Sequence, residues 1–150
     1  MMKTLMMLAL SLATFNLLAL ESELGDLEGQ YLVGYESEIG PIPGSIISLE
    51  RDGTLTLVEL VNPITGEDGP FVCKGEARLV GEAVQSSIKC ENGREYTQTV
   101  YSIDRSSGTD QFSAEVTSSL FPGEIAYAVF MRLTEEMREH IEEQMGPLPF

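Results

Sequence analysis

The sequence supplies few of the residues that carry out chemistry. Its 150 residues include one histidine, two cysteines and no tryptophan. His140 lies on an expected helix, with Glu136 one turn earlier and Glu143 one turn later. The sequence offers no further partner that would complete a zinc site or a Ser-His-Asp arrangement around it. We therefore expect no catalytic residue, no metal site and no cofactor, and we predict that the chain is not an enzyme.

Basic residues are also scarce. Nine lysines and arginines stand against 24 aspartates and glutamates, which gives a net charge of -15 at pH 7. Nucleic acids and anionic lipid surfaces attract basic patches, so this charge argues against both as partners. An acidic surface would instead attract a cationic ligand or a basic protein.

One long apolar run occurs, at the start of the chain. Residues 1–19, MMKTLMMLALSLATFNLLA, place one lysine before an uncharged apolar segment, which is the layout of a secretory signal peptide. We expect cleavage after Ala19. A retained membrane anchor is the alternative, although the run is short for a bilayer span of about 20 apolar residues. The sequence thus predicts a periplasmic or secreted protein that is not an integral membrane protein, with one domain over residues 20–150.

Residues 71–90 predict a β-hairpin. Gly81 and Glu82 suit a two-residue type II′ loop, because glycine accepts a positive φ at the first loop position. Counting outward from this loop, Cys73 falls directly opposite Cys90 at a non-hydrogen-bonded pair, where α-carbons are about 4.5 Å apart. Two cysteines in an exported chain at this separation predict one structural disulfide.

The same register sorts the hairpin into two faces. The apolar face carries Phe71, Cys73, Ala77, Leu79, Val84, Ile88 and Cys90. The polar face carries Lys74, Glu76, Arg78, Gln85, Ser87 and Lys89. An antiparallel sheet with one buried and one solvated side requires this alternation, and a slip of one residue would destroy it together with the cysteine pairing.

Short strands with tight turns continue on both sides of the hairpin. We expect strands at residues 29–35, 45–50, 54–60, 71–80, 83–90, 94–104, 112–120 and 125–133, and a helix over about 134–145. Eight sequential antiparallel strands are best closed as an all-β up-and-down barrel, which leaves no exposed edge, with the helix packed outside. An outer-membrane barrel is the rival architecture, but it needs an outward apolar band, whereas the outward faces here are mostly polar.

Three turns decide which side chains point inward. A three-residue loop at residues 51–53 would pair Leu49 with Leu55 and place Gly53 at a left-handed position. We expect residues 92–93 to form a two-residue type I′ turn and residues 122–123 to turn the chain into the last strand. Strict pairing after these turns points inward Glu95, Thr97, Thr99, Tyr101, Ile125, Tyr127, Val129, Met131 and Leu133. A bulge in residues 94–104 would send Tyr96 and Val100 inward instead.

The start of the first strand resembles a known family. Gly29, Gln30 and Tyr31 are similar to the Gly-x-Trp opening of lipocalins and related calycins, with tyrosine in place of tryptophan. In that family the aromatic residue closes the floor of the barrel, and an arginine at the end of the last strand packs against it. Arg132 stands at the corresponding place. The resemblance implies that Gly29, Tyr31 and Arg132 close the barrel and that the interior carries a small apolar molecule.

Two functional hypotheses follow from the sequence. The first is an exported barrel that binds a small apolar or amphipathic molecule, with pocket residues Tyr35, Phe71, Glu95, Tyr101 and Tyr127. The second is a protein-binding module, such as an inhibitor of a basic lysozyme or protease, that uses an acidic rim at one end of the barrel. The acids expected on that rim are Glu36, Glu38, Glu59, Glu67, Asp68, Glu91, Glu95 and Glu124.

Overall fold

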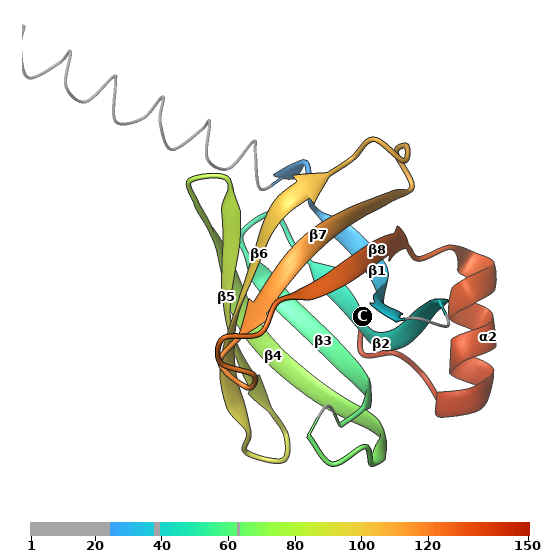
Figure 1. The fold of residues 1–150 in the computed structure, drawn as a ribbon. Coiled ribbons are helices and arrows are strands. Elements are labelled where there is room, and N and C mark those ends of the chain that lie inside the picture. Colours follow the sequence, from blue (N-terminus) through green and yellow to red (C-terminus); the bar gives the residue numbers. More distant parts are fainter. Residues whose placement is uncertain (1–24, 38–39, 63) are drawn as a thin grey trace, which may run out of the picture.

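The computed structural model describes residues 25–37, 40–62 and 64–150, and the predicted signal peptide lies outside these residues. They form eight strands followed by one helix (Figure 1). The elements are β1 (Gly29–Ser37), β2 (Gly40–Leu49), β3 (Thr54–Val61), β4 (Asp68–Val80), β5 (Ala83–Cys90), β6 (Glu95–Asp104), β7 (Gln111–Ser118), β8 (Ala126–Arg132) and α2 (Glu135–Met145). Within the described residues, no helix is long and apolar enough to cross a membrane.

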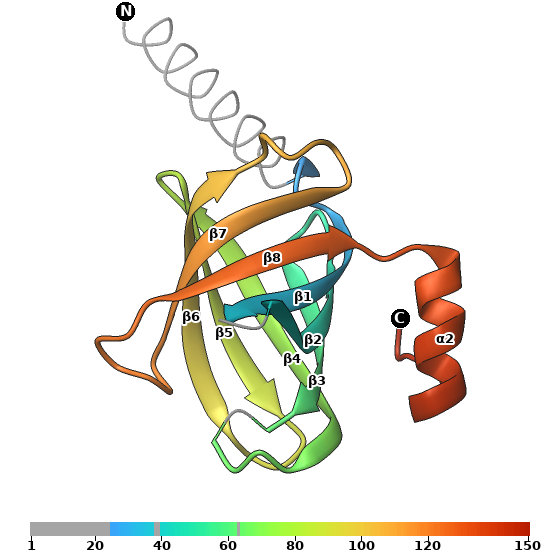
Figure 2. The same ribbon diagram turned by 45° about the vertical axis from the view of Figure 1, so that its right-hand side comes forward.

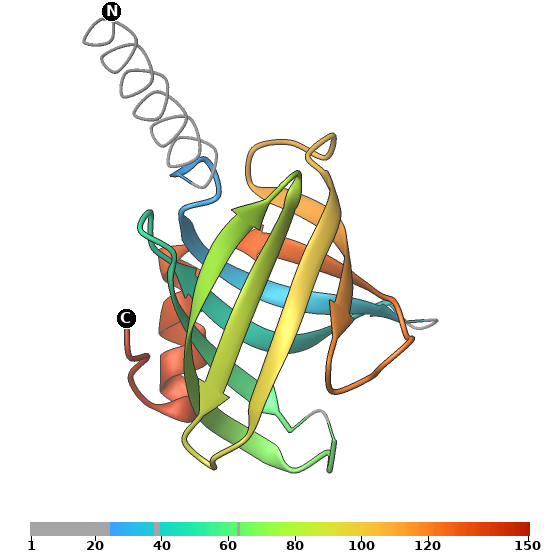
Figure 3. The ribbon, with the colours of Figure 1, turned by 90° about the vertical axis from the view of Figure 1, so that its left-hand side faces the viewer.

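The strands close into one antiparallel barrel in sequence order, and β8 pairs with β1. Figure 2 shows β8 and β1 side by side, and Figure 3 shows the opposite wall, formed by β4, β5 and β6. Closure satisfies the backbone hydrogen-bonding groups that an open sheet would leave at its edges. The predicted fold class, an eight-stranded up-and-down barrel with a C-terminal helix, is confirmed.

Helix α2 lies outside the barrel wall (Figure 1). Thr134 caps its first turn by accepting a hydrogen bond from the Met137 backbone N–H, and Gly146 ends the helix with a φ of 86°. No side chain of this helix is fully buried. Arg138 connects it to the barrel by a hydrogen bond to the Gln30 side chain on β1.

The hairpin of β4 and β5 has the predicted register. Val80 pairs with Ala83 at the turn, and Cys73 pairs with Cys90. The two cysteines form a disulfide, and both are buried. The three-residue loop between β2 and β3 is also confirmed, because Leu49 pairs with Leu55 and Gly53 adopts a φ of 94°.

The turn between β5 and β6 differs from the prediction. Residues 91–93 form a three-residue loop in which Gly93 donates a hydrogen bond to the Cys90 carbonyl and adopts a φ of 84°. This loop is one residue longer than the expected two-residue turn, so Cys90 faces Arg94 and Ile88 pairs with Tyr96. A shift of one residue moves every side chain of the strand to the other face. The expected inward positions of Glu95, Thr97, Thr99 and Tyr101 are therefore wrong, and Tyr96 and Val100 point inward.

Strand β8 is also reversed relative to the prediction. The expected turn at residues 122–123 exists, since Glu124 donates to the Phe121 carbonyl, but it lies within a longer connection. The first β7–β8 pair is Val116 with Ala126, so the turn does not set the register. The inward residues of β8 are Ala126, Ala128 and Phe130. This pairing places Tyr127, Val129 and Met131, which were expected inside, on the outer face. Ile125 and Leu133 lie just beyond the two ends of β8, and Ile125 lines the cavity described below.

The disulfide is expected to contribute to stability mainly through the unfolded chain. Cys73 and Cys90 are 17 residues apart, and a closed loop of this length stabilises a fold by about 3 kcal/mol in the chain-entropy model. We expect the double variant Cys73→Ala and Cys90→Ala to lose about that much unfolding free energy in urea titrations. A loss below about 1 kcal/mol would show that the closed barrel holds the hairpin without the cross-link.

Candidate functional site

A cavity of about 490 Å³ opens at one end of the barrel. We call this the open end; it carries the β1–β2, β3–β4, β5–β6 and β7–β8 connections. Most of the lining side chains are apolar, and a few are polar. The lining residues are Tyr35, Gly44, Ser45, Leu57, Glu59, Val61, Tyr96, Gln98, Val116, Ser118, Leu120, Phe121, Glu124, Ile125 and Ala126. This combination of apolar walls and few polar groups is typical of small-molecule sites.

A smaller cavity of about 70 Å³ lies deeper in the barrel. Tyr35, Ser45 and Gln98 line both cavities, so these three residues form the boundary between them. Below this boundary the walls are aliphatic and aromatic, and they include Val33, Val100 and Phe130. The deeper part of the barrel is therefore filled mainly by side chains, and the usable volume lies toward the open end.

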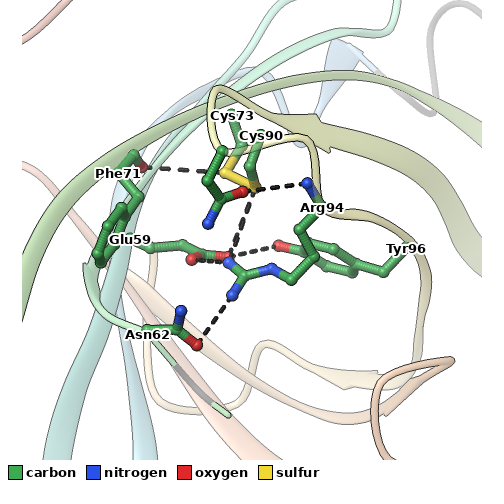
Figure 4. The surroundings of a disulfide bond; sticks show 8 residues. Glu59, Asn62, Phe71, Cys73, Cys90, Arg94 and Tyr96 are labelled. Atoms are coloured by element: carbon green, nitrogen blue, oxygen red, sulfur yellow. Dashed lines mark hydrogen bonds and ion pairs between the residues drawn. A yellow bond between two sulfur atoms is a disulfide. The ribbon is translucent and has the colours of Figure 1, made fainter. Parts of the chain in front are cut away.

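A buried ion pair lies beside the larger cavity. The Glu59 side chain is 5% exposed and the Arg94 side chain 13%, and Arg94 Nη2 donates to Glu59 Oε2 (Figure 4). Arg94 Nη1 also donates to Asn62 Oδ1 over 2.9 Å. Tyr96 donates its hydroxyl proton to Glu59 Oε1 over 3.2 Å. The carboxylate is thus held by Tyr96 on β6 and by Arg94 just before that strand, which fixes its position at the cavity wall.

The two tyrosines near Glu59 resist ionisation. Burial raises the pKa of the Tyr96 hydroxyl, and the negative charge of Glu59 raises it further. Burial and the same carboxylate also raise the pKa of Tyr35. A buried phenol beside a carboxylate is disfavoured as an anion for both reasons. Tyr35 and Tyr96 therefore remain neutral hydrogen-bonding groups in the cavity wall well above pH 7.

The disulfide lies against this ion pair (Figure 4). Arg94 Nη2 is 3.8 Å from Cys90 Sγ, and Glu59 Oε1 is also 3.8 Å from that sulfur. Ligand atoms of Glu59, Cys73 and Cys90 lie within 4.8 Å of one another. A zinc site would need free thiolates, whereas both sulfurs here are bonded to each other. Of these three residues Glu59 alone lines the cavity, and the disulfide packs behind it.

The other end of the barrel is closed by Tyr31, which is 2% exposed. Its hydroxyl donates to the Leu27 carbonyl over 2.8 Å. Arg132 pairs with Tyr31 across β8 and β1, and its guanidinium carbon lies 5.2 Å from the centre of the tyrosine ring. Gly29 adopts a φ of 149°, and a methyl group added there would lie 2.5 Å from Arg132 Nη1. The contact expected between Tyr31 and Arg132 is present, and Gly29 makes room for it.

The structure separates the predicted pocket residues. Tyr35 lines both cavities, whereas Phe71 lies beside Cys73 on β4 without lining either of them. Glu95 is on the outer face, where its carboxylate lies 3.3 Å from the Lys89 ammonium. Tyr127 is 57% exposed, and Tyr101 lies with it on the outer face because both pair with Glu115. The predicted cavity positions of Glu95, Tyr101 and Tyr127 are wrong for the reasons of register given above.

Sequence reasoning assigned Glu59 to the acidic rim, but the residue is inside the barrel. A signal for this position was present, because Leu55, Leu57 and Glu59 alternate along one face of β3, and the two leucines mark that face as the buried one. Tyr96 had an inward position only under the alternative with a bulge in residues 94–104, and the structure places it inside through a longer β5–β6 loop instead.

Comparisons with known proteins add little. No protein-family model matches the chain, and no curated protein matches it. Three solved chains match it in structure. One of them is described as "De novo design of a fluorescence-activating beta barrel"; it is 12% identical, and the match covers 71% of this chain and 93% of that chain with a TM-score of 0.46. This likeness carries no argument about function, which must be argued from the cavity itself.

The Glu59–Arg94 pair is expected to behave as one coupled unit. Glu59→Gln leaves a buried guanidinium without its anion, and Arg94→Met leaves a buried carboxylate without its cation, so each should cost about 3 kcal/mol of unfolding free energy. The double variant removes both charges and should lose at least about 2 kcal/mol less than the sum of the single losses. Urea unfolding of the four proteins measures this coupling. Additive losses, within about 0.5 kcal/mol, would contradict the buried pair.

Gly29 provides a test of the closed end. Gly29→Ala should strain a backbone with positive φ and displace Arg132 from the Tyr31 ring, for a loss of about 2 kcal/mol. Gly108→Ala is the matched control, because Gly108 also has a positive φ, 121°, but no atom within 4 Å of the added methyl group. Thermal unfolding should show a larger loss for Gly29→Ala. Equal losses would mean that backbone strain alone is responsible and that the approach of Arg132 is unimportant.

Proposed function

We propose that the chain is an exported β-barrel that binds a small apolar or amphipathic molecule in the cavity at the open end. The observation that carries the proposal is the cavity of about 490 Å³, whose apolar walls surround a small number of polar groups. A cavity of this size is within the range that holds a small organic ligand. The role proposed is binding rather than catalysis.

Two further features support the lipocalin-like part of the proposal. The cavity opens at the end opposite to Tyr31 and Arg132, so the contact that resembles the calycin floor lies at the closed end. Gly29, the glycine of the Gly-x-Trp-like opening, leaves room for Arg132 at this end. Export is supported by the predicted signal peptide at residues 1–19 and by the Cys73–Cys90 disulfide, since disulfides persist in oxidising compartments.

The alternative, a module that binds a basic protein, rests on exposed acids at the open end. These are Glu36, Glu67, Asp68, Glu91 and Glu124. Glu59 no longer belongs to this group, because it is buried and paired with Arg94. Exposed carboxylates also serve solubility and do not specify a partner. The cavity is the more specific feature, so we rank ligand binding first.

The proposal is tested with N-phenyl-1-naphthylamine, a neutral apolar dye that fluoresces in dry sites. The protein with its natural sequence should bind the dye. Ala126→Trp should weaken dye binding about tenfold or more, because Ala126 lines the cavity near its mouth and the indole would occupy the space. Ala83→Trp is the matched control, since Ala83 begins β5 beside the β4–β5 turn at the closed end and lines neither barrel cavity. Absence of dye binding, or equal weakening by both variants, would contradict a site inside the open end.

A further inference from the structure

The charged side chains that line the open-end cavity are all acidic. Among the described lining residues these are Glu59, at the inner wall, and Glu124, in the β7–β8 connection near the mouth. Arg94 neutralises Glu59 but does not itself line the cavity. A ligand in the cavity would therefore meet the carboxylate first, with the guanidinium behind it.

Glu59 retains capacity to accept hydrogen bonds. Its Oε1 accepts one hydrogen bond from Tyr96 and its Oε2 accepts one from Arg94. Each carboxylate oxygen can accept two, so about two acceptor positions remain. Glu59 is a lining residue, and this unused capacity can be satisfied by a ligand that donates protons.

Two aromatic residues share the cavity with this carboxylate, and one of them, Tyr96, is hydrogen-bonded to it. Tyr35 and Tyr96 both line the cavity, and each is close enough to Glu59 for its charge to raise the pKa of the phenol. Aromatic faces attract cations through the ring quadrupole, most strongly where water is excluded. A cavity lined by a carboxylate and two tyrosines is thus suited to an ammonium group.

We propose that the cavity selects amphiphiles whose polar head is a protonated amine, with the ammonium seated against Glu59, Tyr35 and Tyr96. This inference rests on the binding role proposed above and specifies the chemical class of its ligand. The apolar body extends toward the mouth along Leu57, Val61, Val116, Phe121 and Ile125. Amphiphiles with an anionic head are disfavoured, because a carboxylate at this position faces Glu59 directly and passes Glu124 on entry.

The exposed acids at the open end reinforce this selection. Glu67 on the β3–β4 connection, Asp68 at the start of β4 and Glu91 on the β5–β6 connection raise the local concentration of cations near the mouth. This attraction acts through solvent and weakens with salt. The interaction with Glu59 is shielded from water and should persist in salt, so the two contributions can be separated by measuring binding at low and high ionic strength.

The test compares three ligands with the same ten-carbon chain, decylamine, decanol and decanoate, as competitors of N-phenyl-1-naphthylamine at pH 7. Decylamine should bind at least about tenfold more tightly than decanoate, with decanol between them, and the order should hold in high salt. Decanoate binding as tightly as decylamine would overturn the selection of amines. If decanoate bound as tightly as decylamine but decanol still displaced the dye, the proposed binding role would stand without the selection of amines. If neither the dye nor any of the three competitors bound, the binding role and the selection of amines would both be rejected.

Variants assign the selection to Glu59. Glu59→Gln frees the Arg94 guanidinium from its anion, so the preference should reverse and decanoate should bind more tightly than decylamine. Glu95→Gln is the matched control, because it makes the same change in net charge on the outer face and should leave the order unchanged. If Glu59→Gln does not fold, the double variant Glu59→Gln and Arg94→Met removes both charges, and the three affinities should then differ by less than about threefold. An unchanged preference for decylamine in either Glu59 variant would contradict the assignment.

Discussion

The buried Glu59–Arg94 ion pair is the interaction on which the open end of the barrel depends. It joins β3 to the β5–β6 loop, lies against the disulfide between β4 and β5, and positions the only buried carboxylate among the described residues at the cavity wall. Two charges removed from water are costly unless they are paired and hydrogen-bonded. Asn62 and Tyr96 provide the additional hydrogen bonds. The arrangement requires one register of β5 against β6, because only that register brings Arg94 opposite Cys90 and Tyr96 inside.

Each end of the barrel has an arginine at its wall, but one end is filled and the other is open. At the closed end a guanidinium covers a tyrosine ring, and the aromatic cluster of Tyr31, Phe112 and Phe130 fills the interior. At the open end a guanidinium pairs with a carboxylate in the wall, and the centre remains unfilled. Ala126, a small residue at the start of β8, lines this space and leaves room that a larger side chain would occupy. The chain therefore concentrates its packing at one end and its cavity at the other.

The sequence was sufficient to predict the barrel, the hairpin register and the disulfide, because each rests on a local pattern of alternation and turn residues. It was insufficient for the inward faces of β6 and β8, because these depend on loop lengths that sequence alone leaves open. Because the β5–β6 loop has one more residue than expected, Tyr96 and Val100 point inward and Glu95 and Tyr101 point outward. The prediction of the pocket residues was affected most by these errors. Three of the five predicted residues lie on the outer face, whereas Tyr35 lines the cavity.

The central claim is that a small amphiphile enters the barrel at its open end. The most direct measurement is a ¹H–¹⁵N correlation spectrum of the protein during titration with decanol, whose neutral head tests the cavity independently of charge. Shifts should concentrate at residues around the open-end cavity, such as Ser45, Gln98 and Val116, with small changes at the closed end and on the outer face. Shifts confined to outward residues such as Lys74, Thr97 and Tyr127, or no shifts at all, would contradict this claim.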